Sequence, residues 1–121
     1  NYKVICLTQK VQKFYNVDKQ IYYCGPKEFL GYIQNAEYVV TDSFHGTVFS
    51  IIFKKEFYTY IAIKQSSTRI FSLLTIIGET DRIIGPENIT TFLLKNYPTR
   101  NEKELDEKIK FSKDFLRNCI N

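Results

Sequence analysis

The single histidine, His45, stands in a stretch whose residue types could bind an anion or transfer a proton. Thr41-Asp42-Ser43 ends two positions before His45, and Gly46-Thr47 follows His45 directly. An imidazole donates hydrogen bonds to phosphate or carboxylate oxygens and exchanges protons near neutral pH. The N–H groups at the beginning of a helix also favour an anion. A helix that begins here would therefore place an anion site beside a proton donor.

The residues around His45 predict a strand, a turn and a helix. Tyr38-Val39-Val40 favours a strand, and an apolar segment at helical spacing runs from Val48 to Ile52. In an α/β sheet, ligands bind where strands end and helices begin. Ser43 or Asp42 is expected to cap the helix, and a capped helix can still bind an anion. For His45 the alternative is a purely structural role.

Two arginines, Arg69 and Arg82, are the candidates for holding a carboxylate or phosphate with two parallel hydrogen bonds. Arg69 begins a predicted helix, where a cation opposes the helix dipole. The alternative for each arginine is a solvated charge or a surface ion pair.

The sequence has no P-loop, no dinucleotide fingerprint and no serine-nucleophile motif, and no His/Asp/Glu cluster predicts a metal.

Strand-like and helix-like stretches alternate along the 121 residues. We expect strands at residues 3–7, 20–24, 37–41, 56–63 and 83–84, and helices at residues 26–35, 46–54, 68–77 and 101–120. Residues 89–94 fit either a short helix or a loop. This order predicts an α/β fold, namely a Rossmann-like three-layer α/β/α domain with a mainly parallel sheet, covering residues 1–121 as one domain.

The terminal helix has the clearest pattern. Asn101 and Glu104 form a capping box. Apolar residues then fall on one side of the helix, namely Leu105, Ile109, Leu116 and Ile120.

The net charge of +4 lies entirely in residues 1–101, because the tail from Glu102 to Asn121 has five basic and five acidic residues. A modest positive charge favours small anions and acidic glycans, and the absence of a Lys/Arg run argues against nucleic acid.

No apolar stretch approaches the roughly 20 residues that span a bilayer, and the first residues lack a signal-peptide pattern. Three cysteines without C-x-x-C spacing are expected to be free thiols.

The segments AEYVVTDSFHGT (Ala36–Thr47) and FSII (Phe49–Ile52) resemble the signature of the polysaccharide pyruvyl transferase family. The resemblance extends over residues 22–120, and Phe111–Leu116 resembles the family's last helix. It implies a glycosyltransferase-B-like fold with two Rossmann-like halves. This chain would be the C-terminal, donor-binding half, and the N-terminal half of the same enzyme would be its partner.

The resemblance also implies an activity, the transfer of pyruvate from phosphoenolpyruvate to a pair of sugar hydroxyls as a ketal. The acceptor would be a glycan or a lipid-linked saccharide, bound mainly by the other half, so this half alone is expected to be inactive. No cofactor besides the donor substrate is implied. His45 would bind the phosphate or deliver the proton. The residues implied around the donor are Ser43, Phe44, Gly46, Thr47 and either Arg69 or Arg82.

Two other classes of function are compatible with this architecture. A nucleotide-sugar glycosyltransferase would carry an acidic residue that grips the ribose, and no such signature is visible. A flavodoxin-like or receiver-like module would bind a partner without catalysis, but a receiver needs an acidic pair after its first strand, where Leu7-Thr8-Gln9 offers none. The expected location is the cytoplasm, with the inner face of the membrane as the alternative.

Overall fold

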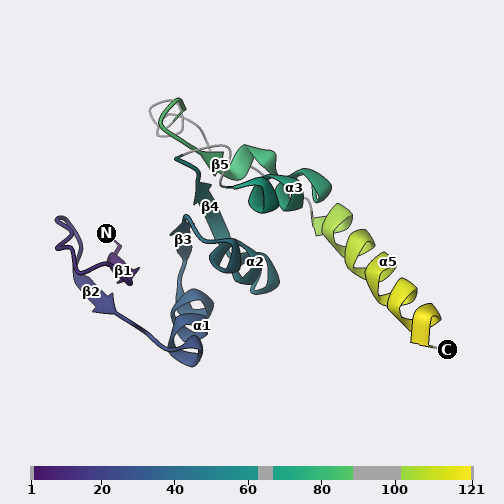
Figure 1. Ribbon diagram of the computed structural model, residues 1–121, viewed down its shortest axis with the longest axis horizontal. Coiled ribbons are helices and arrows are strands. Elements are labelled where there is room, and N and C mark those ends of the chain that lie inside the picture. The colour runs from purple at the N-terminus through teal and green to yellow at the C-terminus, as the bar shows by residue number, and fades with distance from the viewer. Residues whose placement is uncertain (1, 63–66, 89–101, 121) are drawn as a thin grey trace.

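The computed structural model describes residues 2–62, 67–88 and 102–120 (Figure 1). Its elements follow the predicted order and give an α/β, Rossmann-like fold. They are β1 (Ile5–Thr8), β2 (Lys19–Tyr22), α1 (Pro26–Asn35), β3 (Tyr38–Thr41), α2 (Phe44–Ile52), β4 (Glu56–Tyr60), α3 (Thr68–Ile76), the 3₁₀ turn η2 (Thr80–Arg82), β5 (Ile83–Ile84) and α5 (Glu102–Ile120). The undecided segment 89–94 and the predicted cap Asn101 lie outside the described residues.

Every strand pairing in the described part of the chain is parallel, as predicted. β1 pairs with β2, and β3, β4 and β5 form a second sheet in that order. The strands thus form two sheets, whereas the sequence predicted one. The division follows β2, where Tyr23 has a φ of 52° that cannot continue an extended strand. Figure 1 shows the two sheets apart, with α1 connecting them.

The core lies between α2, β4, α3 and the first turn of α5. Phe57 of β4 and Leu74 of α3 are fully buried at its centre. Around them pack the buried residues Ile51, Ile70, Ile77 and Leu105. The positions of α2 and α3 therefore depend on apolar residues at helical spacing, which is the pattern that predicted both helices.

Left-handed residues end both helices that carry the core. Gly78 follows α3 with a φ of 71°, as predicted for a helix ended by glycine. Lys54 follows α2 with a φ of 53°, and the Lys55 N–H donates to the Ser50 carbonyl oxygen over 2.8 Å. This closure ends α2 at Ile52, two residues before the predicted boundary.

Among the described residues, no helix is both long enough and apolar enough to cross a membrane. The longest, α5, buries only Leu105. Three other members of its predicted apolar side, Ile109, Leu116 and Ile120, are exposed.

Candidate functional site

Helix α2 begins at Phe44, two residues earlier than predicted, because Ser43 caps it. The Ser43 hydroxyl accepts a hydrogen bond from the Gly46 N–H over 3.3 Å, and its carbonyl oxygen accepts one from the Thr47 N–H over 3.0 Å. Ser43 therefore satisfies the N–H groups of Gly46 and Thr47, two of the residues expected around the donor. Within the described residues, the N–H groups of Phe44 and His45 have no acceptor. These two are the donors that the helix start offers to a ligand.

Buried hydroxyls fix the turn before α2. The Thr41 hydroxyl accepts a hydrogen bond from the Ser43 N–H over 3.1 Å. The Thr47 hydroxyl donates to the Ser43 carbonyl oxygen over 3.0 Å and lies 2.9 Å from the hydroxyl of Thr59 on β4. Thr47 and Thr59 have no exposed surface. The Thr47 side chain, a predicted substrate contact, is thus placed in the interior, where it holds the turn against the sheet.

Gly46 allows α2 to begin directly against the end of β3. A Cβ at this position would overlap the Thr41 side chain, with the Thr41 Cβ at 3.0 Å and its hydroxyl closer still. Gly46 is itself buried, and one turn later the Ser50 hydroxyl donates to its carbonyl oxygen over 2.7 Å. The structure therefore gives this glycine a role in the close packing of helix on strand.

Phe44, His45 and Arg69 form a cluster where α2 and α3 begin. The guanidinium carbon of Arg69 lies 5.0 Å from the centroid of the Phe44 ring. The His45 ring meets the Phe44 ring edge to face, with centroids 6.0 Å apart and planes at 81°. Arg69 and His45 are exposed, and His45 has no hydrogen bond to any described residue. Arg69 and the starts of α2 and α3 contribute positive charge at this surface, and the exposed carboxylate of Asp42 in the same turn contributes negative charge.

A family model for polysaccharide pyruvyl transferase matches residues 3–64, just over half of the chain. The chain belongs to this family. The matched segment runs from β1 through β4 and includes the whole turn from Ser43 to Thr47, but neither candidate arginine. Searches among curated proteins and among solved structures gave no match.

The second candidate arginine of this pyruvyl transferase family member lies elsewhere. Arg82 is buried, with 1% of its surface exposed. Its Nε donates to Glu79 over 2.8 Å, and its Nη1 donates to Glu56 over 3.1 Å and to the Phe57 carbonyl oxygen over 3.2 Å. It also lies over the Phe57 ring, 4.9 Å from the centroid. Arg82 is therefore neither a surface charge nor a group facing solvent, but the centre of a buried ion pair.

Strand register places Arg82 and the His45 turn at opposite ends of the parallel strands. Glu56 begins β4 opposite Tyr38, the first residue of β3, whereas Thr59 lies opposite Thr41, the last residue of β3. Arg82 contacts the amino end of β4, and the His45 turn follows the carboxyl end of β3. The structure thus places Arg69 against Phe44, which His45 also contacts, and places Arg82 in a buried ion pair away from the turn.

Sequence reasoning missed Thr59, which helps to hold this family member's turn in place. It appears in the sequence as an ordinary strand residue. Thr47 and Thr59 are twelve positions apart in the sequence and lie on different elements. No short-range sequence pattern therefore indicates that they are in contact. Within the described residues, no three His, Cys, Asp or Glu side chains gather closely enough to hold a metal ion.

Proposed function

We propose that this chain is the donor-binding half of an enzyme that transfers pyruvate from phosphoenolpyruvate to two hydroxyls of a sugar. The product would be a ketal in a cell-surface polysaccharide. The observation that carries the proposal is the cluster of Arg69, Phe44 and His45 where α2 and α3 begin. Phe44 and His45 lie within the segment that the family model matches. The cluster offers separate groups for the two anionic ends of phosphoenolpyruvate.

The phosphate is assigned to the start of α2. The N–H groups of Phe44 and His45 are free there, and the exposed His45 ring lies beside them. Such donors suit phosphate oxygens. The carboxylate is assigned to Arg69, whose fork of N–H groups fits two oxygens at once. Phe44 supports the face of that guanidinium at 5.0 Å, which leaves its edge available for the carboxylate.

The proposed reaction needs one proton donor and no redox step. Protonation of the methylene carbon of phosphoenolpyruvate makes its central carbon electrophilic, and a sugar hydroxyl attacks that carbon. The bond to phosphate then breaks, and the second sugar hydroxyl attacks the same carbon to close the ketal. The two hydroxyls lose two protons, of which one balances the new methyl group and the other leaves with inorganic phosphate. His45 is the candidate for the first proton transfer or for holding the phosphate.

The acceptor, a glycan or a lipid-linked saccharide, is assigned mainly to an N-terminal half of the same enzyme. This division predicts that residues 1–121 bind phosphoenolpyruvate but do not turn it over. The cytoplasm, where phosphoenolpyruvate is available, is the proposed location, with attachment to the inner face of the membrane as the alternative.

Calorimetry with phosphoenolpyruvate tests the binding step. Wild-type protein should bind phosphoenolpyruvate more tightly than inorganic phosphate or pyruvate alone, because only the complete donor reaches both His45 and Arg69. A nucleotide sugar and a flavin nucleotide serve as comparison ligands. Preferential binding of either comparison ligand would contradict the proposal. Release of phosphate that depends on added acceptor saccharide, measured on the whole enzyme, tests the transfer itself.

A further inference from the structure

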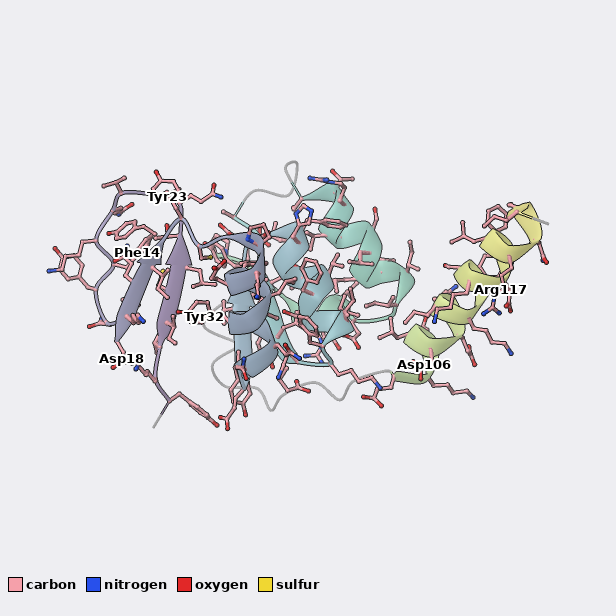
Figure 2. The ribbon with its side chains drawn as sticks, turned by 90° about the horizontal axis from the view of Figure 1, so that it is seen from below. Phe14, Asp18, Tyr23, Tyr32, Asp106 and Arg117 are labelled. Carbon is pink, nitrogen blue, oxygen red and sulfur yellow. The ribbon has the colours of Figure 1, made fainter. Side chains whose placement is uncertain are left out.

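The Phe44 ring is partly buried and connects the core to the surface of the candidate site. It packs against the core cluster that has Phe57 and Leu74 at its centre. Figure 2 shows α2 and α3 side by side, with their first turns toward the same side of the molecule. Phe44 is the first residue of α2, and it contacts Arg69, the second residue of α3. The core therefore fixes the position of a ring that lies where the two helices begin.

Two exposed side chains of the candidate site contact this ring. The guanidinium carbon of Arg69 lies 5.0 Å from the ring centroid. The His45 ring meets it edge to face, with centroids 6.0 Å apart. Neither Arg69 nor His45 has a side-chain hydrogen bond to any described residue. Because an exposed arginine without such a partner samples many rotamers, the contact with Phe44 is what restricts Arg69 within the part of the chain that the structure describes.

We propose that Phe44 is a positioning residue that makes the site selective for a donor with both a phosphate and a carboxylate group. This inference rests on the proposed function, in which Arg69 holds the carboxylate and the start of α2 holds the phosphate. The Phe44 ring covers one face of the guanidinium and leaves the N–H groups at its edge available. A side chain that is already restricted loses less freedom when it binds, and this raises affinity. The backbone N–H groups of α2 do not need the ring to bind phosphate.

Two other roles for Phe44 predict different results. The family resemblance implies that Phe44 contacts the donor directly. In that case, loss of the ring and loss of Arg69 would weaken binding independently of each other. A role in core packing alone would be served equally well by leucine. A positioning role differs from both, because the ring then matters only while Arg69 is present.

Calorimetry with phosphoenolpyruvate and with inorganic phosphate tests the selectivity. Phe44→Leu keeps an apolar side chain against the core but removes the ring. It should weaken phosphoenolpyruvate binding about threefold to tenfold and leave phosphate binding within about twofold. Phe44→Met, a second variant without a ring, should do the same, and Phe44→Tyr should retain the wild-type affinities. Phe49→Leu is the matched control, because Phe49 is another partly buried phenylalanine of α2, whose ring stacks on that of Phe53.

A double variant separates positioning from direct contact. Phe44→Leu added to Arg69→Gln should cause no further loss of phosphoenolpyruvate affinity, since the ring acts through Arg69. A further loss as large as that in the wild-type background would show that the ring contacts the donor, and it would overturn the proposal. Equal weakening of phosphoenolpyruvate and phosphate binding by Phe44→Leu would also overturn it, because the ring would then support the turn as a whole.

The same measurements distinguish this proposal from the proposed function. If wild-type protein does not bind phosphoenolpyruvate, the proposed function fails and the selectivity fails with it. If wild-type protein prefers phosphoenolpyruvate and Phe44→Leu keeps that preference, only the role of Phe44 is overturned. The ring contact has a separate readout in the free protein, because His45 is the single histidine. Its imidazole signals in nuclear magnetic resonance spectra should shift in Phe44→Leu and stay in place in Phe49→Leu. Equal spectra of both variants would contradict the contact.

Discussion

The guanidinium group of Arg69 stacks on the ring of Phe44 at 5.0 Å and joins the beginning of α3 to the beginning of α2. The Phe44 ring is partly buried and Arg69 is exposed. A cation over an aromatic ring at the protein surface contributes only about 0.5–1 kcal/mol, so the contact is too weak to decide the fold. A cation at a helix start also works against the dipole of α3. Its consequence is positional, because it holds one guanidinium on the same Phe44 ring that the His45 ring contacts.

Replacement of Arg69 tests this position. In the whole enzyme, Arg69→Gln should raise the Michaelis constant for phosphoenolpyruvate by about tenfold or more, because a hydrogen bond between charged groups is lost. The melting temperature should stay the same or rise slightly, since a cation leaves the start of a helix. Lys27→Gln is a matched control, because Lys27 is also an exposed cation at the second residue of a helix. Equal kinetic effects of the two changes would remove Arg69 from the site.

Arg82 should behave in the opposite way. Arg82→Ala leaves the buried Glu79 and the partly buried Glu56 without their cation, so the free energy of unfolding should fall by about 3–5 kcal/mol. Arg117→Ala is the control in denaturant titrations, because its pair with Asp114 is exposed and contributes less than about 1 kcal/mol. Losses of similar size for both arginines would contradict the buried network.

Arg69 and Arg82 show how much of the site could be predicted from the sequence. Both were candidates because arginine suits carboxylates, and the local sequence distinguishes them only by the place of Arg69 at the start of a predicted helix. Strand register separates them, since Arg82 contacts the amino end of β4 and the turn follows the carboxyl end of β3. Strand register depends on residues that are far apart in the sequence. It therefore cannot be inferred from helical periodicity or from strand alternation.

Local signals predicted the elements better than their assembly. Helix α1 has its predicted bounds because Pro26 fixes its start and apolar residues repeat along it. The predicted cap at Ser43 is confirmed, but the start of α2 was predicted two residues late, because the sequence left open whether Ser43 or Asp42 is the cap. The division into two sheets was not predicted, because it depends on a left-handed Tyr23, a conformation that tyrosine rarely adopts.

Gly46 should tolerate no side chain. Gly46→Ala places a methyl group against the Thr41 side chain, and we expect a loss of about 1–3 kcal/mol in the free energy of unfolding. Gly31→Ala is the matched control, since Gly31 also lies within a helix and a Cβ there would meet nothing within 4 Å. It should stabilise the protein by about 0.5–1 kcal/mol. Thermal unfolding of both variants would show opposite shifts, and shifts of the same sign would contradict the close packing.

Thr59 should act on the site without touching it. Thr59→Val removes the hydroxyl that lies 2.9 Å from the Thr47 hydroxyl in the interior. The Thr47 hydroxyl keeps its hydrogen bond to the Ser43 carbonyl oxygen, so we expect the free energy of unfolding to fall by about 0.5–1.5 kcal/mol, the contribution of one hydrogen bond. Thr59→Ser keeps the hydroxyl and should retain the turn, at the smaller cost of one methyl group. Phosphoenolpyruvate binding should weaken in the Val variant and recover in the Ser variant. Equal binding by both would show that the hydroxyl does not position the turn.

His45 provides the most direct test of the proposed chemistry. Its ring is exposed and makes no hydrogen bond to any described residue, so His45→Gln should leave the melting temperature unchanged. In the whole enzyme, kcat/KM for pyruvyl transfer should fall by about a hundredfold or more, because glutamine can donate a hydrogen bond but cannot transfer a proton. A fall in kcat would assign proton transfer to His45, and a rise in KM alone would assign it to phosphate binding. Asp42→Asn, at an exposed neighbour in the same turn, should leave both constants near the wild-type values. A folded His45→Gln enzyme with unchanged kinetics would exclude the histidine from both roles.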